Sequence, residues 1–363
     1  MFFQKIQRWF ERYERHISSV GLPGGIVFTW FAVSEIDGFR EHEWIIGYLI
    51  LTFLSIIVIN AIEQRAISKR SSWMRKLHFV LLLVVQFSFG ALFSTFFVFY
   101  ARSSSLFVSW PFILLIAVVL ISNELIRQHY ARVSVQIITL FLAIYLYMIF
   151  LVPVVVHRMG DDVFIASGIA SLVVLYGFLF ILRIIFGNKL SASRPYITLF
   201  IIIILCGINA LYFTKLIPPI PLSLSSIGVY HDLRQIGGNT FVGKKEPITF
   251  VSYMKTGEIF HRVNNESVYV WAVIFSPTEF ATQVVHKWYY FNVKQNEWIL
   301  TNRITLPMTY SKGNGYKTYS LKEATFPGLW RVSVETLDGQ VLGQIKFTIE
   351  KISSSPKLVE EKL

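Results

Sequence analysis

The side chains considered first for acid–base or metal chemistry are the five histidines expected outside the membrane or at its outer interface: His42, His157, His231, His261 and His286. None has a second histidine at the close spacing of a metal motif, so a metal site would need ligands from distant segments. The single cysteine, Cys206, excludes a disulfide framework, a cysteine zinc site and an iron–sulfur centre. No Gly-x-Ser-x-Gly elbow, phosphate-binding glycine loop or His-Glu-x-x-His motif is present. We therefore expect no enzyme activity, no cofactor and no metal.

A second group of side chains suits recognition rather than reaction. His286, Trp288 and Tyr290 alternate along one expected strand, and Trp330 and Arg331 lie on another. Aromatic rings beside an arginine are typical of surfaces that stack on a sugar or hold a partner protein. The other interpretation is a sandwich core with Trp330 at its centre. Burial separates the two, and these five are the predicted partner-binding residues.

The elements that must position these residues begin with a membrane part. The 363 residues are 54% hydrophobic and only 15% charged, with a mean hydropathy of +0.53. Soluble domains carry about 25% charged residues, so this composition predicts an integral membrane protein with a soluble part. The net charge of +12 arises mostly in short loops between apolar runs. That placement fits membrane orientation and argues against a nucleic-acid partner.

A helix that spans a membrane needs roughly 20 apolar residues. Seven apolar runs are candidates for such helices, and they lie near 22–37, 44–62, 77–100, 106–122, 133–156, 163–186 and 196–217. The first has the shortest apolar part, Leu22 to Val33, because Glu35 and Asp37 follow it. With a cytoplasmic N-terminus, only four basic residues up to residue 219 fall on the outer side, namely Arg40, Arg102, Arg158 and Lys215. This bias predicts seven spans and a C-terminal domain outside the cytoplasm.

Residues 1–21 form an expected amphipathic helix on the cytoplasmic leaflet. Its aromatic side, which includes Trp9, faces the bilayer, and its basic side carries Lys5, Arg8, Arg12 and Arg15. These five residues are the predicted anchors at the membrane surface. A helix that binds a partner is the alternative interpretation.

The soluble part follows a proline-rich stretch. Residues 218–244 are predicted to be a semi-rigid connector, because Pro218, Pro219 and Pro221 favour extended geometry. Residues 245–350 alternate with period two between turn signals, which predicts an antiparallel β-sandwich of immunoglobulin-like kind. Residues 351–363 are predicted to be a polar, frayed tail. The fold class is therefore a seven-helix membrane domain, 22–217, followed by an all-β domain.

Polar groups within the spans leave other functions open. No charge occupies a span centre, which argues against a proton-coupled pump. Small and polar residues suit helix packing, yet they could also line a path for a lipid or solute; they are Gln86, Gly90, Ser94, Ser167, Gly168, Ser171 and Asn209. An enzyme at the outer interface would use the residues Glu35, Asp37, His157, Asp161 and Asp162. A sensor is a further alternative, but it would need a cytoplasmic output domain, which we do not expect from this sequence.

Several segments together resemble a bacterial membrane family whose outer domain is called domain of unknown function 2914. They are Asn123-Glu124, 152–158, 217–224, 228–231, 270–278, His286-x-Trp288 and 328–343. The outer resemblance covers about residues 245–350. One departure is the turn Asn292 to Asn296, which lacks an expected glycine, so that hairpin is predicted to be longer. The resemblance implies a bacterial inner-membrane protein with a periplasmic β-domain, and it implies no activity.

The leading hypothesis is a non-enzymatic inner-membrane protein that presents a periplasmic β-sandwich to another envelope component, most simply a protein. Its partners would be the bilayer and a subunit of an envelope complex. The alternative is a lipid- or solute-handling protein in which the β-domain serves as a lid or acceptor.

Overall fold

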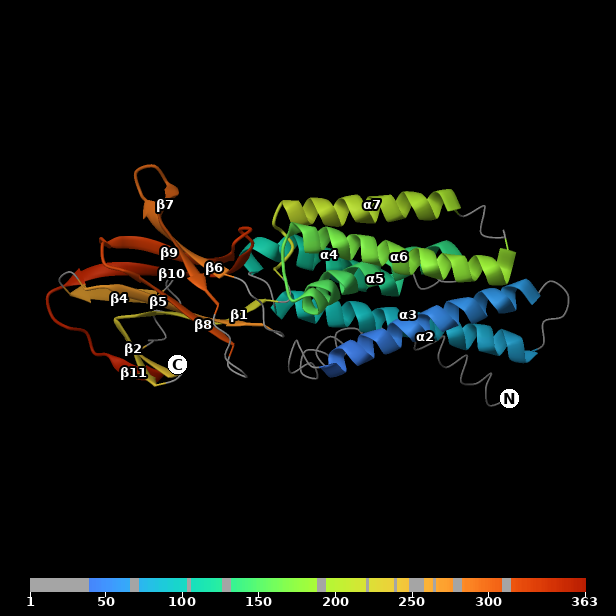
Figure 1. The fold of residues 1–363 in the computed structure, drawn as a ribbon, viewed down its shortest axis with the longest axis horizontal. Helices are drawn as coiled ribbons and strands as arrows, with labels where there is room; N and C mark the ends of the chain where they lie inside the picture. Colours follow the sequence, from blue (N-terminus) through green and yellow to red (C-terminus); the bar gives the residue numbers. More distant parts are fainter. Residues whose placement is uncertain are drawn as a thin grey trace. The chain divides into compact units, whose positions relative to one another are not determined.

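The computed structural model describes residues 39–65, 72–102, 106–125, 132–187, 194–219, 222–237, 240–247, 258–263, 266–276, 283–308 and 315–363. The chain forms two compact units, a helical one that ends at Leu216 and a β-rich one whose continuous part is Ile217–Leu363. Figure 1 labels the elements of both units.

Six helices form the described part of the helical unit: α2 (Phe39–Arg65), α3 (Ser72–Arg102), α4 (Leu106–Leu125), α5 (Val133–Val156), α6 (Asp161–Phe186) and α7 (Arg194–Phe213). Each coincides with one of the predicted apolar runs. All but α4 are long and apolar enough to cross a membrane, while the apolar part of α4 is the shorter stretch Ser109–Ser122. The apolar run at 22–37 and the amphipathic segment with Lys5, Arg8, Trp9, Arg12 and Arg15 lie outside the described residues.

Aromatic side chains fill the interior of the helical unit. Helix α5 packs against α6, α7 and α3, and it is the most buried of the apolar helices. The buried rings on α3 and α5 recur at helical spacing and include Phe89, Phe93, Phe96, Phe99, Tyr100, Phe141, Tyr145 and Tyr147. Apolar side chains turned inward and outward alike are typical of helices that pack together within a bilayer.

Three of the polar side chains considered for a lipid or solute path, Ser167, Ser171 and Asn209, are hydrogen-bonded to groups of the helices, whereas Ser94 Oγ is buried without a hydrogen-bond partner among the described residues. Ser167 and Ser171 donate to the carbonyls of Val163 and Gly168 on their own helix. Asn209 donates to the carbonyl of Leu205 and also to the Tyr145 hydroxyl on α5, at 3.1 Å. These contacts match the packing interpretation, in which a hydroxyl or amide satisfies a backbone group and joins neighbouring helices.

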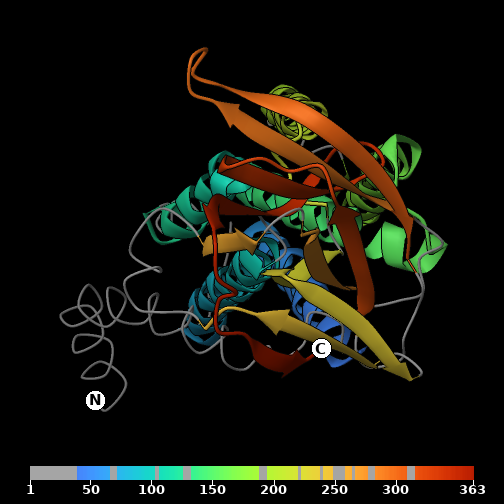
Figure 2. The ribbon, with the colours of Figure 1, turned by 90° about the vertical axis from the view of Figure 1, so that its left-hand side faces the viewer.

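Eleven described strands make up the β-rich unit: β1 (Ser223–Tyr230), β2 (Asp232–Gly237), β3 (Thr240–Lys245), β4 (Glu258–Val263), β5 (Val268–Phe275), β6 (Gln283–Asn292), β7 (Glu297–Pro307), β8 (Tyr316–Lys322), β9 (Gly328–Thr336), β10 (Val341–Ile352) and β11 (Val359–Lys362). They form three sheets with the orders β1-β5-β8, β4-β10-β9-β6-β7 and β11-β3-β2. Figure 2 shows the strands of this unit after a turn of 90° from the view of Figure 1. All described pairings are antiparallel except β4 with β10, so the all-antiparallel prediction is wrong at that pair.

The first two sheets share a hydrophobic core. Val268 and Val270 of β5 pack with Trp288 of β6, Trp330 of β9 and Phe347 of β10 in one cluster. A second cluster joins side chains of β5 and β8 to those of β6, β9 and β10 in the same way. Alternate residues of each strand point into this core, which explains the period-two pattern of the sequence.

Two predicted boundaries of the β-rich part differ from the structure. Residues 218–244 are a connector only at their start, because β1, β2 and most of β3 follow within them. The prolines stop at Pro221, and from Ser223 the chain has backbone donors to pair, which β1 does with β5. The tail 351–363 is not frayed: β10 runs to Ile352 and β11 pairs with β3.

Candidate functional site

The predicted partner-binding residues fall on two different faces of the five-stranded sheet. His286, Trp288 and Trp330 have no exposed surface, and Tyr290 is half-buried against Trp330. The side chains of the first three are enclosed in the shared core, which favours the core interpretation over partner binding for them. Arg331 leaves β9 on the opposite face, because successive residues of a strand alternate.

The buried residues among them form a structural hydrogen-bond cluster. Ser320 Oγ lies 2.9 Å from His286 Nδ1 and accepts a hydrogen bond from Trp288 Nε1 at 3.1 Å. Trp330 Nε1 donates to the carbonyl of Phe326 at 2.9 Å. Burial lowers the pKa of His286 to about 4, so this ring is neutral at physiological pH. Buried polar groups that are satisfied in this way specify a core rather than bind a ligand.

Arg331 is the centre of a surface cluster that we call the cationic–aromatic face, formed by Tyr289, Phe291, Trp298, Arg331 and Lys346. The Arg331 guanidinium carbon lies 4.5 Å from the ring centroids of both Tyr289 and Trp298. Lys346 Nζ lies 6.0 Å from the Trp298 centroid, and Phe291 packs on the same indole at 5.2 Å. The three rings are half-buried and Lys346 is exposed, so the cluster is accessible to solvent.

The hairpin of β6 and β7 supplies most of this face. Strand β7 is the last strand of its sheet and pairs only with β6 among the described strands. Figures 1 and 2 show the hairpin reaching beyond its neighbours. Its exposed apolar side chains are Val293 at 78%, Leu300 at 48% and Ile299 at 39% of their surface. Exposed apolar groups beside cations are typical of surfaces that bind other proteins.

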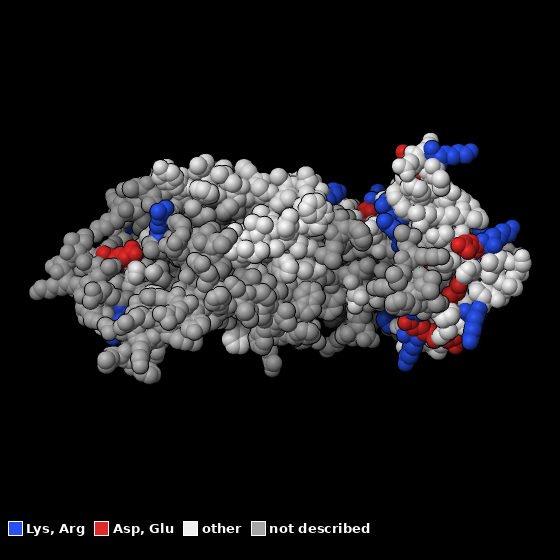
Figure 3. Space-filling model, turned by 180° about the vertical axis from the view of Figure 1, so that it is seen from behind, with Lys and Arg blue, Asp and Glu red and all other residues white. Residues whose placement is uncertain are grey.

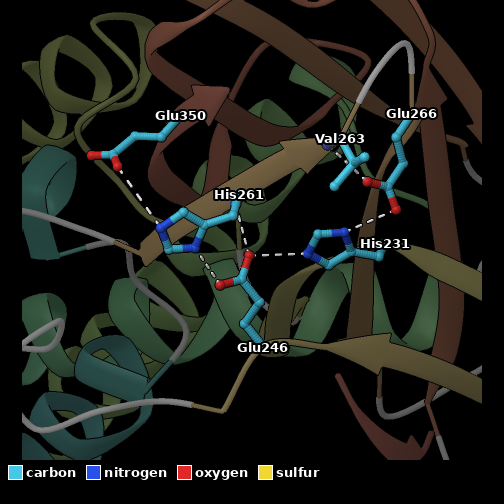
Figure 4. A network of polar contacts seen from close by, with 6 residues as sticks. All are labelled: His231, Glu246, His261, Val263, Glu266 and Glu350. Atoms are coloured by element: carbon cyan, nitrogen blue, oxygen red, sulfur yellow. Dashed lines mark hydrogen bonds and ion pairs between the residues drawn. The ribbon is translucent and has the colours of Figure 1, made fainter. Parts of the chain in front are cut away.

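A second polar cluster, the histidine–glutamate network of Figure 4, joins β1–β4 and the approach to β5. Glu246 binds two histidines: its Oε1 lies 3.1 Å from His231 Nε2, and its Oε2 lies 2.6 Å from His261 Nδ1. The backbone amide of His261 also donates to Glu246, at 2.7 Å. Glu266 lies 3.0 Å from His231 Nδ1, and Glu350 is 3.8 Å from His261 Nε2.

The electrostatics of this network favour a charged pair at its centre. Burial alone lowers the pKa of His231, whose side chain is 2% exposed, but the hydrogen bonds and charges of Glu246 and Glu266 outweigh it and raise that pKa. Burial acts against the Glu246 carboxylate as well, yet its bonds to His231 and His261 lower its pKa to about 2. The His231 ring also stacks on Phe260, with centroids 4.0 Å apart. Opposite charges held this closely stabilise each other's ionised form.

The network is better suited to holding strands together than to catalysis. Its carboxylates and ring nitrogens are bound to one another. No group of three or more metal-ligating side chains that could hold an ion occurs in the described part of the chain. Of the residues considered for an interfacial enzyme, Asp161 accepts a hydrogen bond from Tyr212 at 3.0 Å, and Glu35 and Asp37 lie outside the described residues.

Charged side chains also distinguish the two units. In the view of Figure 3 the described acidic and basic residues gather over the β-rich unit, while the described helical surface carries few of them. The exposed side chains of the helices include large apolar ones such as Phe87, Phe180 and Ile184. This distribution supports membrane association of the helices.

Comparison with known proteins adds one family. Residues 281–349 match the family model described as "Protein of unknown function (DUF2914)". We call these matched residues, 281–349, the DUF2914 region. The resemblance expected from the sequence is confirmed for this part of the chain, which runs from just before β6 into β10. The DUF2914 region thus contains both the buried tryptophans and the cationic–aromatic face.

Similarity to other proteins is too low to indicate a fold or a function. No curated protein matches the chain. A β-glucosidase from Listeria innocua in complex with gluconolactone matches at 12% identity over 32% of this chain and 17% of that chain, with a TM-score of 0.19. The alkylpurine DNA glycosylase AlkC of Pseudomonas fluorescens, bound to DNA with an abasic site analogue, matches at 10% identity over 79% of this chain and 84% of that chain, with a TM-score of 0.21.

Several residues of the two clusters are not evident from the sequence. Tyr289, Phe291 and Trp298 of the cationic–aromatic face were passed over in favour of the equally aromatic positions Trp288 and Tyr290. Glu246 and Glu266 gave no signal, because they lie 15 and 35 residues from the His231 that they bind. The positions of Tyr289 and Phe291 two residues apart were the one local sign of a second aromatic face.

Proposed function

We propose that this protein is a non-enzymatic bacterial inner-membrane protein whose helices anchor a periplasmic β-domain that binds a protein component of the envelope. The helices would span the membrane seven times, counting the run at 22–37, with the N-terminus cytoplasmic. The β-domain would be an immunoglobulin-like sandwich built on the two sheets that share a core. The distribution of basic residues between the expected loops supports this orientation.

The observation that carries the proposal is the half-buried Arg331 held between Tyr289 and Trp298 on the DUF2914 region. Arginine, tyrosine and tryptophan are the residues most enriched where binding energy concentrates in protein interfaces. Holding a long arginine side chain between rings lowers the entropy that it loses on binding. The neighbouring hairpin adds exposed apolar surface at Leu300 and Val293.

Site-specific cross-linking in native membranes tests this proposal. A photoreactive residue at position 300, on the same face as Tyr289, should form a covalent adduct with one protein partner of the full-length chain. The matched control is a photoreactive residue at position 234, whose side chain on β2 is 71% exposed but belongs to another sheet. We expect an adduct from position 300 alone, lost on Arg331→Glu. Equal adducts from both positions, or none from position 300, would remove the proposal.

A further inference from the structure

Arg331 has hydrogen-bonding capacity that the described protein does not use. Its Nε is buried and has no hydrogen-bond partner, and no carboxylate of the described residues forms an ion pair with its guanidinium. Glu335, the acidic group whose charge acts on Arg331, is already bound to Lys287 at 2.6 Å. A partly buried arginine without an acceptor has an energetic reason to take one from outside.

The neighbourhood of Arg331 is also cationic. Lys346 of β10 lies directly opposite Arg331 in the antiparallel register. Like charges at opposite positions of a sheet destabilise the pair, and the Trp298 ring, which lies near both, offsets this only in part. An anion bound near both cations would be attracted to each of them.

The geometry of the guanidinium selects among anions. The rings of Tyr289 and Trp298 fix its position. Because Nε is buried, the two terminal NH2 groups are the donors that can meet an acceptor from outside. A planar fork of N–H donors matches the two oxygens of a carboxylate. The exposed apolar side chains Val293, in the turn of the adjoining hairpin, and Leu300, opposite Tyr289, suit a ligand that carries apolar groups beside its acids. A polypeptide supplies both kinds of group, and inorganic phosphate supplies only charge.

We propose that the cationic–aromatic face binds an acidic, partly apolar polypeptide segment, with one Asp or Glu carboxylate on the Arg331 guanidinium. This inference rests on the proposed function and names the chemistry of its partner. Lys346 adds long-range attraction for the same segment, and Leu300 contacts its apolar side chains. The binding should therefore weaken as salt is added, because the charges on this face are accessible to solvent.

The test uses the full-length protein in mild detergent and two short labelled peptides with blocked ends. One alternates Glu with Leu, and the other carries Gln in place of every Glu. Fluorescence anisotropy gives the affinity of each peptide for the native protein and for the variants Arg331→Gln, Arg331→Lys and Arg234→Gln. Thermal unfolding of each variant confirms that the β-rich unit is folded.

We expect the acidic peptide to bind at least about tenfold more tightly than its Gln analogue, and Arg331→Gln to abolish that difference. Arg331→Lys should retain part of it, because lysine keeps the charge and loses the planar fork. Arg234→Gln should leave affinity unchanged. Equal binding of the two peptides, insensitivity to Arg331→Gln, or displacement by inorganic phosphate as effective as by free glutamate would overturn the inference.

The two proposals fail in different ways. An adduct from position 300 that depends on Arg331, together with equal binding of the two peptides, would keep the proposed function and reject the acidic partner. Arg331-dependent binding of the acidic peptide without any partner adduct would reject the proposed function and leave an isolated carboxylate site.

Discussion

Glu246 Oε1 lies 3.1 Å from His231 Nε2, although His231 lies between β1 and β2 and Glu246 follows β3, 15 positions later. The same carboxylate binds His261 on β4, so one acidic side chain links β4 of the five-stranded sheet to segments that flank β2 and β3 of the small sheet. Because the ion pair is largely shielded from solvent at the histidine, its strength depends on the protonation of both partners.

The stability of the β-rich unit should therefore depend on pH on both sides of a maximum. The pKa of His231 is raised on folding, so its contribution is complete below about pH 6.5 and is lost as pH rises through the folded value. The pKa of Glu246 is lowered to about 2, so its contribution is complete above pH 4.5 and is lost as pH falls toward 2. We expect the highest stability between these limits.

Thermal unfolding of the purified protein from pH 4 to pH 9 measures this dependence. The difference in unfolding temperature between the native protein and His231→Gln should be largest near pH 5.5 and should shrink as pH rises above 6.5. Arg234→Gln, which alters an exposed pair, serves as the control and should give a difference that is flat with pH. A His231→Gln difference that grows toward pH 9 would contradict the raised pKa.

Two tryptophans on opposite faces of the same sheet should respond very differently to truncation. Trp330 is fully buried and contacts Trp288, Tyr290 and Phe326, so Trp330→Ala should lower the free energy of unfolding by about 3–5 kcal/mol. Trp298→Ala removes a half-buried ring from the surface and should cost about 1 kcal/mol. Denaturant unfolding, monitored by hydrogen exchange of the β5 amides, measures the loss in free energy of unfolding for both variants. Similar costs for the two variants would mean that the faces are assigned wrongly.

The sequence predicts an element well when residues close together in the chain determine it. The bounds of β6 were predicted correctly because turn residues flank an uninterrupted run of β-forming residues. The face that this strand buries could not be chosen, since Trp288 and Tyr290 alternate with the equally aromatic Tyr289 and Phe291. Alternation fixes which residues share a face and not which face meets the core.

Other features were missed because their causes lie far apart in the chain. Strand β11 forms from a polar segment whose acids pair with lysines of β3, and Glu361 meets Lys245 at 2.7 Å. Strand β1 was hidden by the prolines before it, although it finds its partner in β5. For the candidate site, sequence reasoning named Arg331 and missed the rings that hold it, since Trp298 comes from a different strand.

The glycine missing from the β6–β7 turn has a structural substitute. Asn296 adopts a left-handed backbone with φ of 53°, which asparagine tolerates better than other residues with a side chain. The turn spans four residues between Asn292 and Glu297, and the Asn292 side chain accepts the amides of Lys294 and Gln295. The departure from the expected family pattern therefore leaves a short hairpin turn, although β7 itself extends to Pro307.

Substitutions at this turn should separate backbone conformation from side-chain chemistry. Asn296→Gly should be neutral or slightly stabilising, and Asn296→Val should cost about 1–2 kcal/mol because a β-branched residue resists positive φ. Lys294→Val is the matched control, since Lys294 is exposed and is not among the residues with positive φ. It should change the unfolding temperature little. Equal losses from both valine variants would indicate a solubility effect rather than backbone strain.

Deletion of residues 356–363 should loosen the β11-β3-β2 sheet and leave the shared core intact. The deletion removes the backbone pairing of Leu363 with Phe241, with N–O distances of 2.8 and 3.2 Å. It also removes Glu361, which binds Lys245 and accepts the Tyr230 hydroxyl at 2.9 Å. Strand β3 would then keep only β2 as a partner, and a two-stranded ribbon is marginal by itself.

Hydrogen exchange resolved by segment measures this effect. Amides of β3, Thr240–Lys245, should exchange at least about tenfold faster in the shortened chain, while those of β6 and β9 should keep their protection. Glu360→Gln is the matched control, because Glu360 is 67% exposed and its 3.5 Å pair with Lys244 contributes little. Unchanged exchange in β3 after the deletion would show that β11 does not stabilise its neighbour. Loss of protection in β6 as well would show that the small sheet and the shared core unfold as one unit.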